Sequence, residues 1–158
     1  MYRTVEDFLS DWKRYSDGTI QVLESLTDEK LDQAIVKGHS TLGWLGWHIA
    51  TSTVFFADLV GLKVASPESN EVPEKAADIV QAYRNISDSL VDEVKRNLTD
   101  EAMLEEVDSF GTLTPRGALL RDVINHQIHH RGQMTVLLRQ AGLHVPGVMG
   151  PTQEQGGY

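Results

Sequence analysis

Three of the chain's six histidines lie within the segment RDVINHQIHHRGQM, which runs from Arg121 to Met134. His126 and His130 are four residues apart, and on an α-helix such positions lie about 40° from each other around the axis. Both imidazoles can therefore point in the same direction, as a metal site requires. An H-x-x-x-H pair is also common on helices that bind no metal, so a third ligand is needed.

Helical periodicity shows which histidines face the interior. His130 lies within the apolar stripe of its helix and His126 lies at its edge, whereas His129 is turned roughly 100° away, toward solvent. His48 lies at the edge of the inward stripe of an earlier helix. Side chains from facing helices can converge, so His48, His126 and His130 could form a three-nitrogen metal site. For His48 alone, a hydrogen-bonded core histidine is the alternative.

Such a site would suit zinc, nickel, copper or iron(II), and three protein ligands leave a position for water or substrate. Three further residues are candidates to orient the imidazoles. Asp122 lies one turn before His126, Gln133 lies close to the His126 side of the helix, and Ser52 lies on the inward stripe that follows His48. Solvation at the helix surface is the alternative for Asp122 and Gln133.

The first half of the chain carries two helical patterns, and no convincing alternating strand is found anywhere. Thr4 is a candidate N-cap for the first helix, whose apolar stripe extends to Leu26. The second helix is expected to begin near Ser40 or Thr41 and to stop at Gly61. It contains the segment WLGWHIATSTVFFADLV.

The second half repeats this plan. Pro73 is placed to open the third helix, and the fourth has Thr114 as its N-cap, Pro115 in its first turn and its end near Gly142. We therefore predict an all-α fold, a four-helix bundle with long connections. Residues 1–158 are expected to form a single domain with a Gly/Pro-rich tail from about residue 143.

A short internal repeat supports two hairpins of similar design. LTDEKL begins at Leu26, after the first helix, and LTDEAML begins at Leu98, after the third. In each, a threonine cap is followed by acidic residues, which predicts the start of a short helix.

The second predicted helix is apolar on its outer side as well as its inner side. Small residues permit close approach of another helix, and a tryptophan supplies area to bury. We expect a homodimer with this face at its interface, formed by Gly43, Trp47, Ala50 and Val54. The alternative is that other parts of the same chain cover it.

Composition limits the possible partners. There are 14 basic and 23 acidic residues, giving a net charge of -9, which argues against a nucleic-acid-binding protein. The chain has no cysteine, so it has no disulfide, and any metal must be bound through nitrogen and oxygen. The charged N-terminus lacks a signal core, and no membrane span is found, so a cytoplasmic protein is expected.

Three motifs together resemble the DinB/YfiT-like superfamily: TLGWLGWHIA around His48, NHQIHHRGQM around His126 and His130, and HVPGVMGP near the C-terminus. The resemblance extends over nearly the whole chain. It implies a four-helix bundle, commonly a homodimer, with a divalent metal bound by His48, His126 and His130. Relatives in this superfamily include thiol-dependent S-transferases, a mycothiol-dependent isomerase and proteins described as metal-dependent hydrolases.

The resemblance therefore predicts a metal-dependent enzyme acting on a small molecule. We expect a thiol-dependent S-transferase in which zinc or nickel activates a low-molecular-weight thiol such as bacillithiol, glutathione or mycothiol, since the chain has no thiol of its own. A hydrolase using metal-bound water is the first alternative, although no acidic residue on the inward stripes offers a general base. A non-catalytic metal-binding stress protein is the second.

Overall fold

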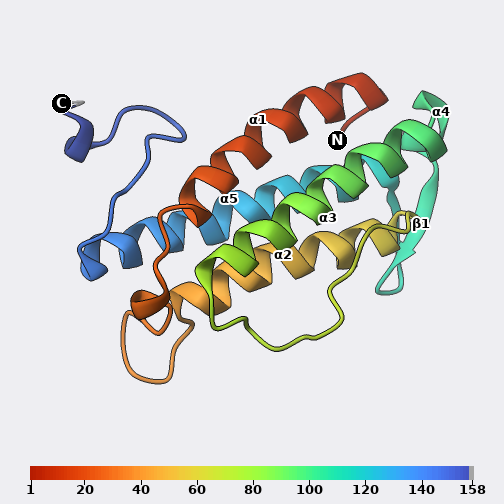
Figure 1. Ribbon diagram of the computed structural model, residues 1–158. Helices are drawn as coiled ribbons and strands as arrows, with labels where there is room; N and C mark the ends of the chain where they lie inside the picture. The colour runs from red at the N-terminus through yellow and green to blue at the C-terminus, as the bar shows by residue number, and fades with distance from the viewer. Residues whose placement is uncertain (157–158) are drawn as a thin grey trace.

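Four long helices lie side by side in the computed structural model, which describes residues 1–156 (Figure 1). They are α1 (Val5–Leu23), α2 (Leu42–Leu59), α3 (Ala76–Asn97) and α5 (Arg116–Ala141). The main contacts join α1 to α3 and α5, and join α2 to the same two helices, so α1 and α2 lie diagonally opposite each other. Shorter elements connect them: η1 (Asp28–Lys30), α4 (Asp100–Leu104), β1 (Glu106–Ser109), β2 (Thr112–Pro115) and η2 (Gln153–Gln155).

Two of the predicted helix starts are confirmed at the atomic level. The Thr4 side chain accepts a hydrogen bond from the Asp7 amide at 3.1 Å, and Thr41 accepts one from the Trp44 amide at the same distance. Each threonine thereby satisfies an amide that the first turn of a helix leaves free. At the C-terminal end of α5, Gly142 has a φ of 73°, a left-handed conformation that glycine adopts without strain.

The LTDE repeat joins the two hairpins through reciprocal caps. Asp28 of the first copy accepts a hydrogen bond from the amide of Ala76, the first residue of α3, at 2.7 Å. Asp100 of the second copy accepts one from the amide of Val5, the first residue of α1, at 2.8 Å. A carboxylate at a helix N-terminus also interacts favourably with the helix dipole. The repeat therefore ties the start of each hairpin to the other hairpin.

This cap explains one error in the predicted boundaries. Pro73 was expected to open the third helix, but α3 begins at Ala76, where Asp28 supplies the acceptor. That carboxylate is 48 residues away along the chain. The local sequence around Pro73 gives no sign of it.

The prediction of an all-α chain is wrong between α4 and α5, where β1 and β2 form an antiparallel hairpin. Thr114, the expected N-cap of the last helix, instead pairs with Val107 in this hairpin, and α5 begins after Pro115. Phe110 and Gly111 form the two-residue tip with φ values of 53° and 82°. Positive φ at both positions matches the right-handed twist of a tight hairpin. Four-residue strands are too short for periodicity to reveal.

The outer face of α2 is covered by the same chain, so the interface predicted for it is wrong. Trp47 is only 7% exposed and donates a hydrogen bond through Nε1 to the Asn70 carbonyl at 3.1 Å. Gly43 faces Leu31 and Val72 so closely that an added Cβ would lie 3.2 Å from Leu31. The connection from α2 to α3 runs along this side of the molecule (Figure 1).

The other two residues of the predicted interface, Ala50 and Val54, also pack within the chain. Ala50 is fully buried, and Val54 is partly buried against the core. The alternative, that other segments of the chain cover the helix, is therefore correct. A helix flanked on both sides by its own chain is apolar around most of its circumference.

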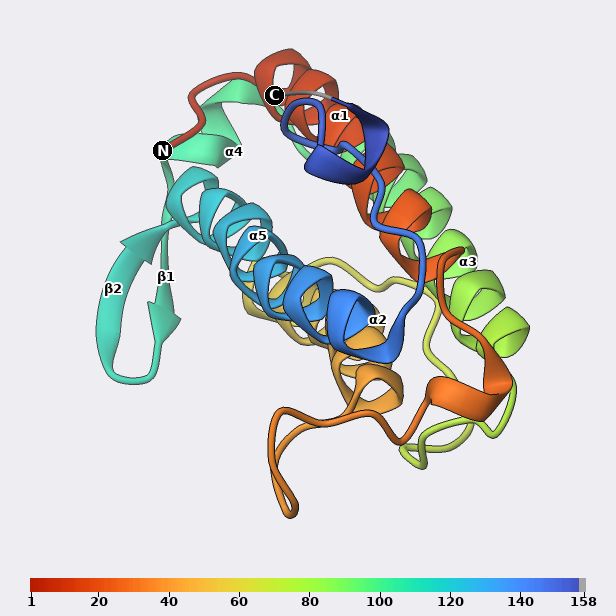
Figure 2. The ribbon, with the colours of Figure 1, turned by 90° about the vertical axis from the view of Figure 1, so that its left-hand side faces the viewer.

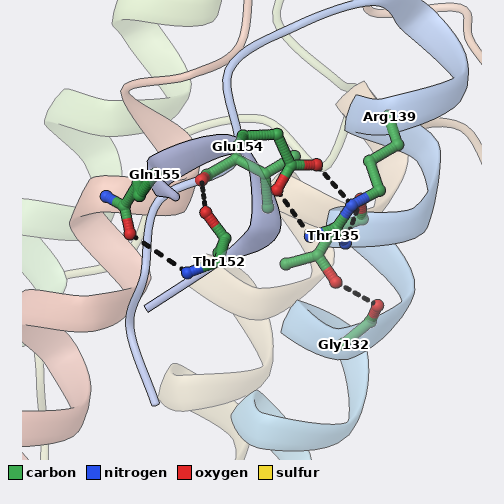
Figure 3. Close-up of polar contacts among 7 residues, drawn as sticks. Gly132, Thr135, Arg139, Thr152, Glu154 and Gln155 are labelled. Atoms are coloured by element: carbon green, nitrogen blue, oxygen red, sulfur yellow. Dashed lines mark hydrogen bonds and ion pairs between the residues drawn. The ribbon is translucent and has the colours of Figure 1, made fainter. Parts of the chain in front are cut away.

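Beyond α5 the chain turns back over α1 and α5 without regular structure until η2. Arg139 on α5 binds both carboxylate oxygens of Glu154, at 2.6 and 3.1 Å (Figure 3). Thr152 and Gln155 form a capping box at the start of η2. These contacts hold the tail against α5.

Candidate metal centre

The three predicted ligands come together on the facing sides of α2 and α5. These helices run in opposite directions, because Arg116 at the start of α5 donates a hydrogen bond to the Val60 carbonyl at the end of α2. His126 Nε2 lies 3.2 Å from His48 Nε2 and 3.1 Å from His130 Nε2. One ligand atom from each of the three rings lies within 4.8 Å of the other two. Three imidazole nitrogens therefore converge on one point.

Residues outside the cluster decide which ring nitrogens carry protons. The Ser52 hydroxyl donates to the Ile49 carbonyl at 3.1 Å, so its oxygen is left to accept from His126 Nδ1 at 3.3 Å. Gln133 Oε1 lies 2.8 Å from His130 Nδ1 and accepts a hydrogen bond from it. In the neutral form of either ring, these hydrogen bonds hold the proton on Nδ1, and the Nε2 lone pair faces the centre.

Burial keeps these rings in the form that binds metals. Desolvation, with smaller contributions from the neighbouring His130 and His48, lowers the pKa of His126 to about 4. Desolvation also lowers the pKa of His48, with a contribution from His130. At neutral pH both rings are therefore unprotonated, which is the state required of a metal ligand.

The donor set fits a divalent transition metal. Imidazole nitrogens bound to zinc at about 2.0–2.1 Å in tetrahedral geometry are about 3.3 Å apart. The Nε2 separations of 3.1 and 3.2 Å are close to this spacing. Lone pairs that face each other this closely repel, so a cation between them would stabilise the arrangement. Across residues 1–156, no carboxylate or fourth histidine joins the group.

Aromatic side chains border the histidines on α2. The Trp44 ring stacks on His48 with the ring centroids 4.7 Å apart and the planes 9° apart. Trp44 is nevertheless 42% exposed, so its other face is open to a ligand. Phe56 lies against His126 at a centroid distance of 5.5 Å. Trp44 therefore differs from Trp47, which is only 7% exposed and packs in the core.

Of the three residues predicted to orient the imidazoles, the structure supports two. Ser52 and Gln133 contact the rings, whereas Asp122 is exposed, and His126 Nδ1 is bonded to Ser52 instead. His129 is exposed, as expected from its position on the helix. Its Nε2 lies 3.3 Å from Gln133 Nε2.

Arg131 directly follows His130 and is only 3% exposed. Its guanidinium donates to the Tyr15 carbonyl at 2.9 Å and to Thr19 Oγ1 at 3.4 Å. Arg131 therefore links α5 to α1 and does not face the histidine cluster.

Sequence reasoning also missed Gln127, which is fully buried where the four long helices meet. Its Oε1 lies 2.8 Å from the Tyr83 hydroxyl and 3.0 Å from Thr19 Oγ1, and its Nε2 donates to Thr53 Oγ1 at 3.3 Å. The available signal was a polar residue at helical spacing from Val123 and Ile124, within an apolar stripe.

Comparison with known proteins identifies the family. The model described as "DinB family" matches residues 1–156. The chain belongs to the DinB family. It is 40% identical over 156 residues to "Uncharacterized protein YrdA" of Bacillus subtilis (strain 168), and the match covers 98% of this chain and 93% of that protein.

Solved structures agree with this assignment. A crystal structure of a DinB-like protein from Bacillus cereus ATCC 10987 superposes with a TM-score of 0.89 at 42% identity, covering 93% of this chain and 99% of that one. A second DinB-like protein, YjoA of B. subtilis, gives a TM-score of 0.69 at 21% identity and covers 89% and 94% of the two chains. The second likeness concerns the fold alone. Within the described residues, each helix is too short or too polar to cross a membrane.

Proposed function

We propose that this DinB protein is a metal-dependent transferase that activates a low-molecular-weight thiol. The observation that carries the proposal is the convergence of Nε2 atoms from His48, His126 and His130, spaced 3.1 and 3.2 Å apart along the cluster. Zinc or nickel is the metal we expect. Three protein ligands leave at least one position open, as a catalytic site needs and a structural zinc site does not.

A divalent metal bound there would supply Lewis acidity, which lowers the pKa of an adjacent thiol and favours its thiolate form. The chain's own residues would provide orientation and exclusion of water. Ser52 and Gln133 hold the rings of His126 and His130 by hydrogen bonds to Nδ1. Trp44 fixes the plane of His48 by stacking, and its exposed face would bind part of the substrate.

The thiol nucleophile would come from a small molecule, because the chain has no cysteine. One feature favours thiol chemistry over hydrolysis. Hydrolysis usually needs a general base beside the metal, and no carboxylate of the described residues belongs to the histidine group. The predicted homodimer stays a prediction, with its interface at residues other than those on the covered face of α2.

The first test is metal content per chain, measured by elemental mass spectrometry on untagged protein reconstituted with zinc or nickel. We expect about one metal per chain in the wild type and in His129→Ala, which changes an exposed neighbour of the cluster. His48→Ala and His126→Ala should contain none. Metal binding that survives both changes would remove the basis for the proposal.

The second test measures transfer to 1-chloro-2,4-dinitrobenzene from glutathione, bacillithiol or mycothiol. In this reaction a sulfur–carbon bond forms, the carbon–chlorine bond breaks, chloride leaves, and the thiol proton passes to solvent. We expect one thiol to react faster with the metal-loaded wild type than without protein. Hydrolysis of a nitrophenyl ester without any thiol transfer would identify a hydrolase instead. A metal that raises thermal stability but supports neither reaction would indicate a non-catalytic protein.

A further inference from the structure

A small apolar cavity lies directly beside the histidine cluster. Its volume is about 240 Å³. It is formed by the connection between η1 and α2 together with the adjacent sides of α2 and α5, and its lining includes Ile35, His39, Leu45, Gln133, Val136 and Leu137. In Figure 2 this connection projects from the end of the helices.

The cavity is one helical turn from the proposed metal. Leu45 precedes His48 by three residues on α2, and Gln133 follows His130 by three residues on α5. Because the two helices are antiparallel, both steps lead in the same direction, over about 5 Å. Gln133 belongs to both sites, since its Oε1 is hydrogen-bonded to His130 Nδ1 at 2.8 Å.

The lining would favour an apolar ligand. Ile35 and Val136 are 57% and 46% exposed, so apolar surface at this site remains in contact with water. A larger cavity of about 670 Å³ shares His39 and Ser40 with the first, but is lined by Asp28, Asp32 and Glu74. An alkyl chain would therefore be placed in the smaller cavity, away from the acidic one.

We propose that this cavity binds an alkyl or acyl chain of a substrate whose head group is held at the metal. The inference rests on the proposed function and adds the class of substrate, a small molecule with an unbranched or lightly branched apolar group. A carbon chain advances by roughly 1.3 Å per bond. About four carbons are therefore needed to cover the turn of helix between the histidines and the cavity.

This distance predicts a threshold in chain length. Cobalt(II)-loaded protein would be titrated anaerobically with ethanethiol, butanethiol and hexanethiol, following the cobalt absorption spectrum. The first two should bind with similar affinity, because their carbons do not enter the cavity. Hexanethiol should bind about tenfold tighter than butanethiol, since each buried methylene improves affinity about threefold to fourfold.

A tryptophan at Val136 would fill the mouth of the cavity. In Val136→Trp, hexanethiol should lose its advantage while ethanethiol binds as before. The matched control is Leu113→Trp, which enlarges another exposed apolar side chain, on the β1–β2 hairpin, and should keep the advantage. Ile35→Ser, at an exposed loop position, gives a second variant, in which the advantage should fall to less than half.

The outcomes separate the two proposals. If the thiols bind cobalt with no rise from butanethiol to hexanethiol, or if Val136→Trp keeps the full rise, the cavity is not the chain-binding site. The proposed function would survive that result. If cobalt binds stoichiometrically and no thiol changes its spectrum, the thiol function fails, and this inference fails with it.

Discussion

His126 and Gln127 are neighbours on α5, and both belong to polar clusters, but the two clusters differ in how they are satisfied. Gln127 is fully buried, and its amide is matched by hydroxyl groups from α1, α2 and α3. His126 is half-buried, and its Nε2 faces two other Nε2 atoms. When the Nδ1 atoms of His126 and His130 donate to Ser52 and Gln133, the Nε2 atoms of these two rings face each other at 3.1 Å without a proton between them.

The difference shows how a structural polar cluster can be distinguished from a binding site. Buried polar groups that satisfy each other's hydrogen-bonding capacity stabilise a fold, and they need nothing from outside. The facing lone pairs of His126 and His130 have no donor between them, and a cation would satisfy both. On this criterion the Gln127 cluster is structural, and the histidine cluster is a candidate site for a ligand.

The largest expected effect is on metal binding. His126→Ala should reduce zinc affinity at least a hundredfold, because it removes the central one of three ligands, while the midpoint of urea unfolding of the metal-free protein should change little. A competition titration with a chromophoric chelator measures the affinity. His129→Ala is the control and should bind zinc as the wild type does. A similar loss in both variants would mean that the cluster is not the site.

The reverse pattern is expected for Gln127→Leu. This change leaves the Tyr83 and Thr53 hydroxyls without their partner in the core, and we expect a loss of about 3 kcal/mol in the free energy of unfolding. Zinc affinity of the folded protein should stay the same. Gln140→Leu, on an exposed part of α5, should change the stability little. If Gln127→Leu unfolds at the wild-type urea concentration, the cluster is not structural.

An intermediate effect is expected for the residues that orient the rings. Gln133→Ala and Ser52→Ala should each weaken zinc binding by about tenfold to a hundredfold, because the proton on Nδ1 is then less firmly held. Gln140→Ala is the matched control for Gln133→Ala. Wild-type affinity in both variants would show that the three histidines are positioned by helix packing alone.

The smallest effect should come from the exposed contact between Arg139 on α5 and Glu154 in the C-terminal tail. The hydrogen bonds from Arg139 lower the pKa of Glu154 to about 2. Because the folded pKa is lowered, the contact is complete above about pH 4.5 and is lost as the pH falls toward 2. The protection of amides in residues 143–156, measured as the intrinsic exchange rate at each pH divided by the observed rate, should therefore fall over that range in the wild type.

Glu154→Gln should show faster exchange of these amides already at neutral pH, with the urea midpoint unchanged. Exchange rates equal to those of the wild type would mean that the apolar contacts of the tail, such as the buried Val145, are sufficient to hold it.

The predicted helices and ligands agree with the structure where local signals are strong. Thr4 and Thr41 cap their helices as expected, because capping depends on residues within one turn. The spacing of His126 and His130 and the position of His48 on its helix predicted that these three histidines could meet. The structure brings their ring nitrogens together. His129 was correctly separated from them, because rotation along a helix is regular.

The predictions that were wrong depend on distant parts of the chain. The start of α3 is set by Asp28, and the face of α2 around Trp47 is covered by the connection that contains Asn70. An apolar helix face indicates burial but not what buries it. The buried position of Arg131 likewise depends on distant partners, which are on α1.

The sequence by itself determined the long helices, most of their caps and which histidines could point the same way, because periodicity and capping act within a few residues. Only the tertiary structure decided that the Nε2 atoms meet at 3.1 and 3.2 Å, that Ser52 and Gln133 hold their rings, and that an apolar cavity lies one turn away. These features require the register of α2 against α5. That register follows from the packing of the whole core, which no short stretch of sequence contains.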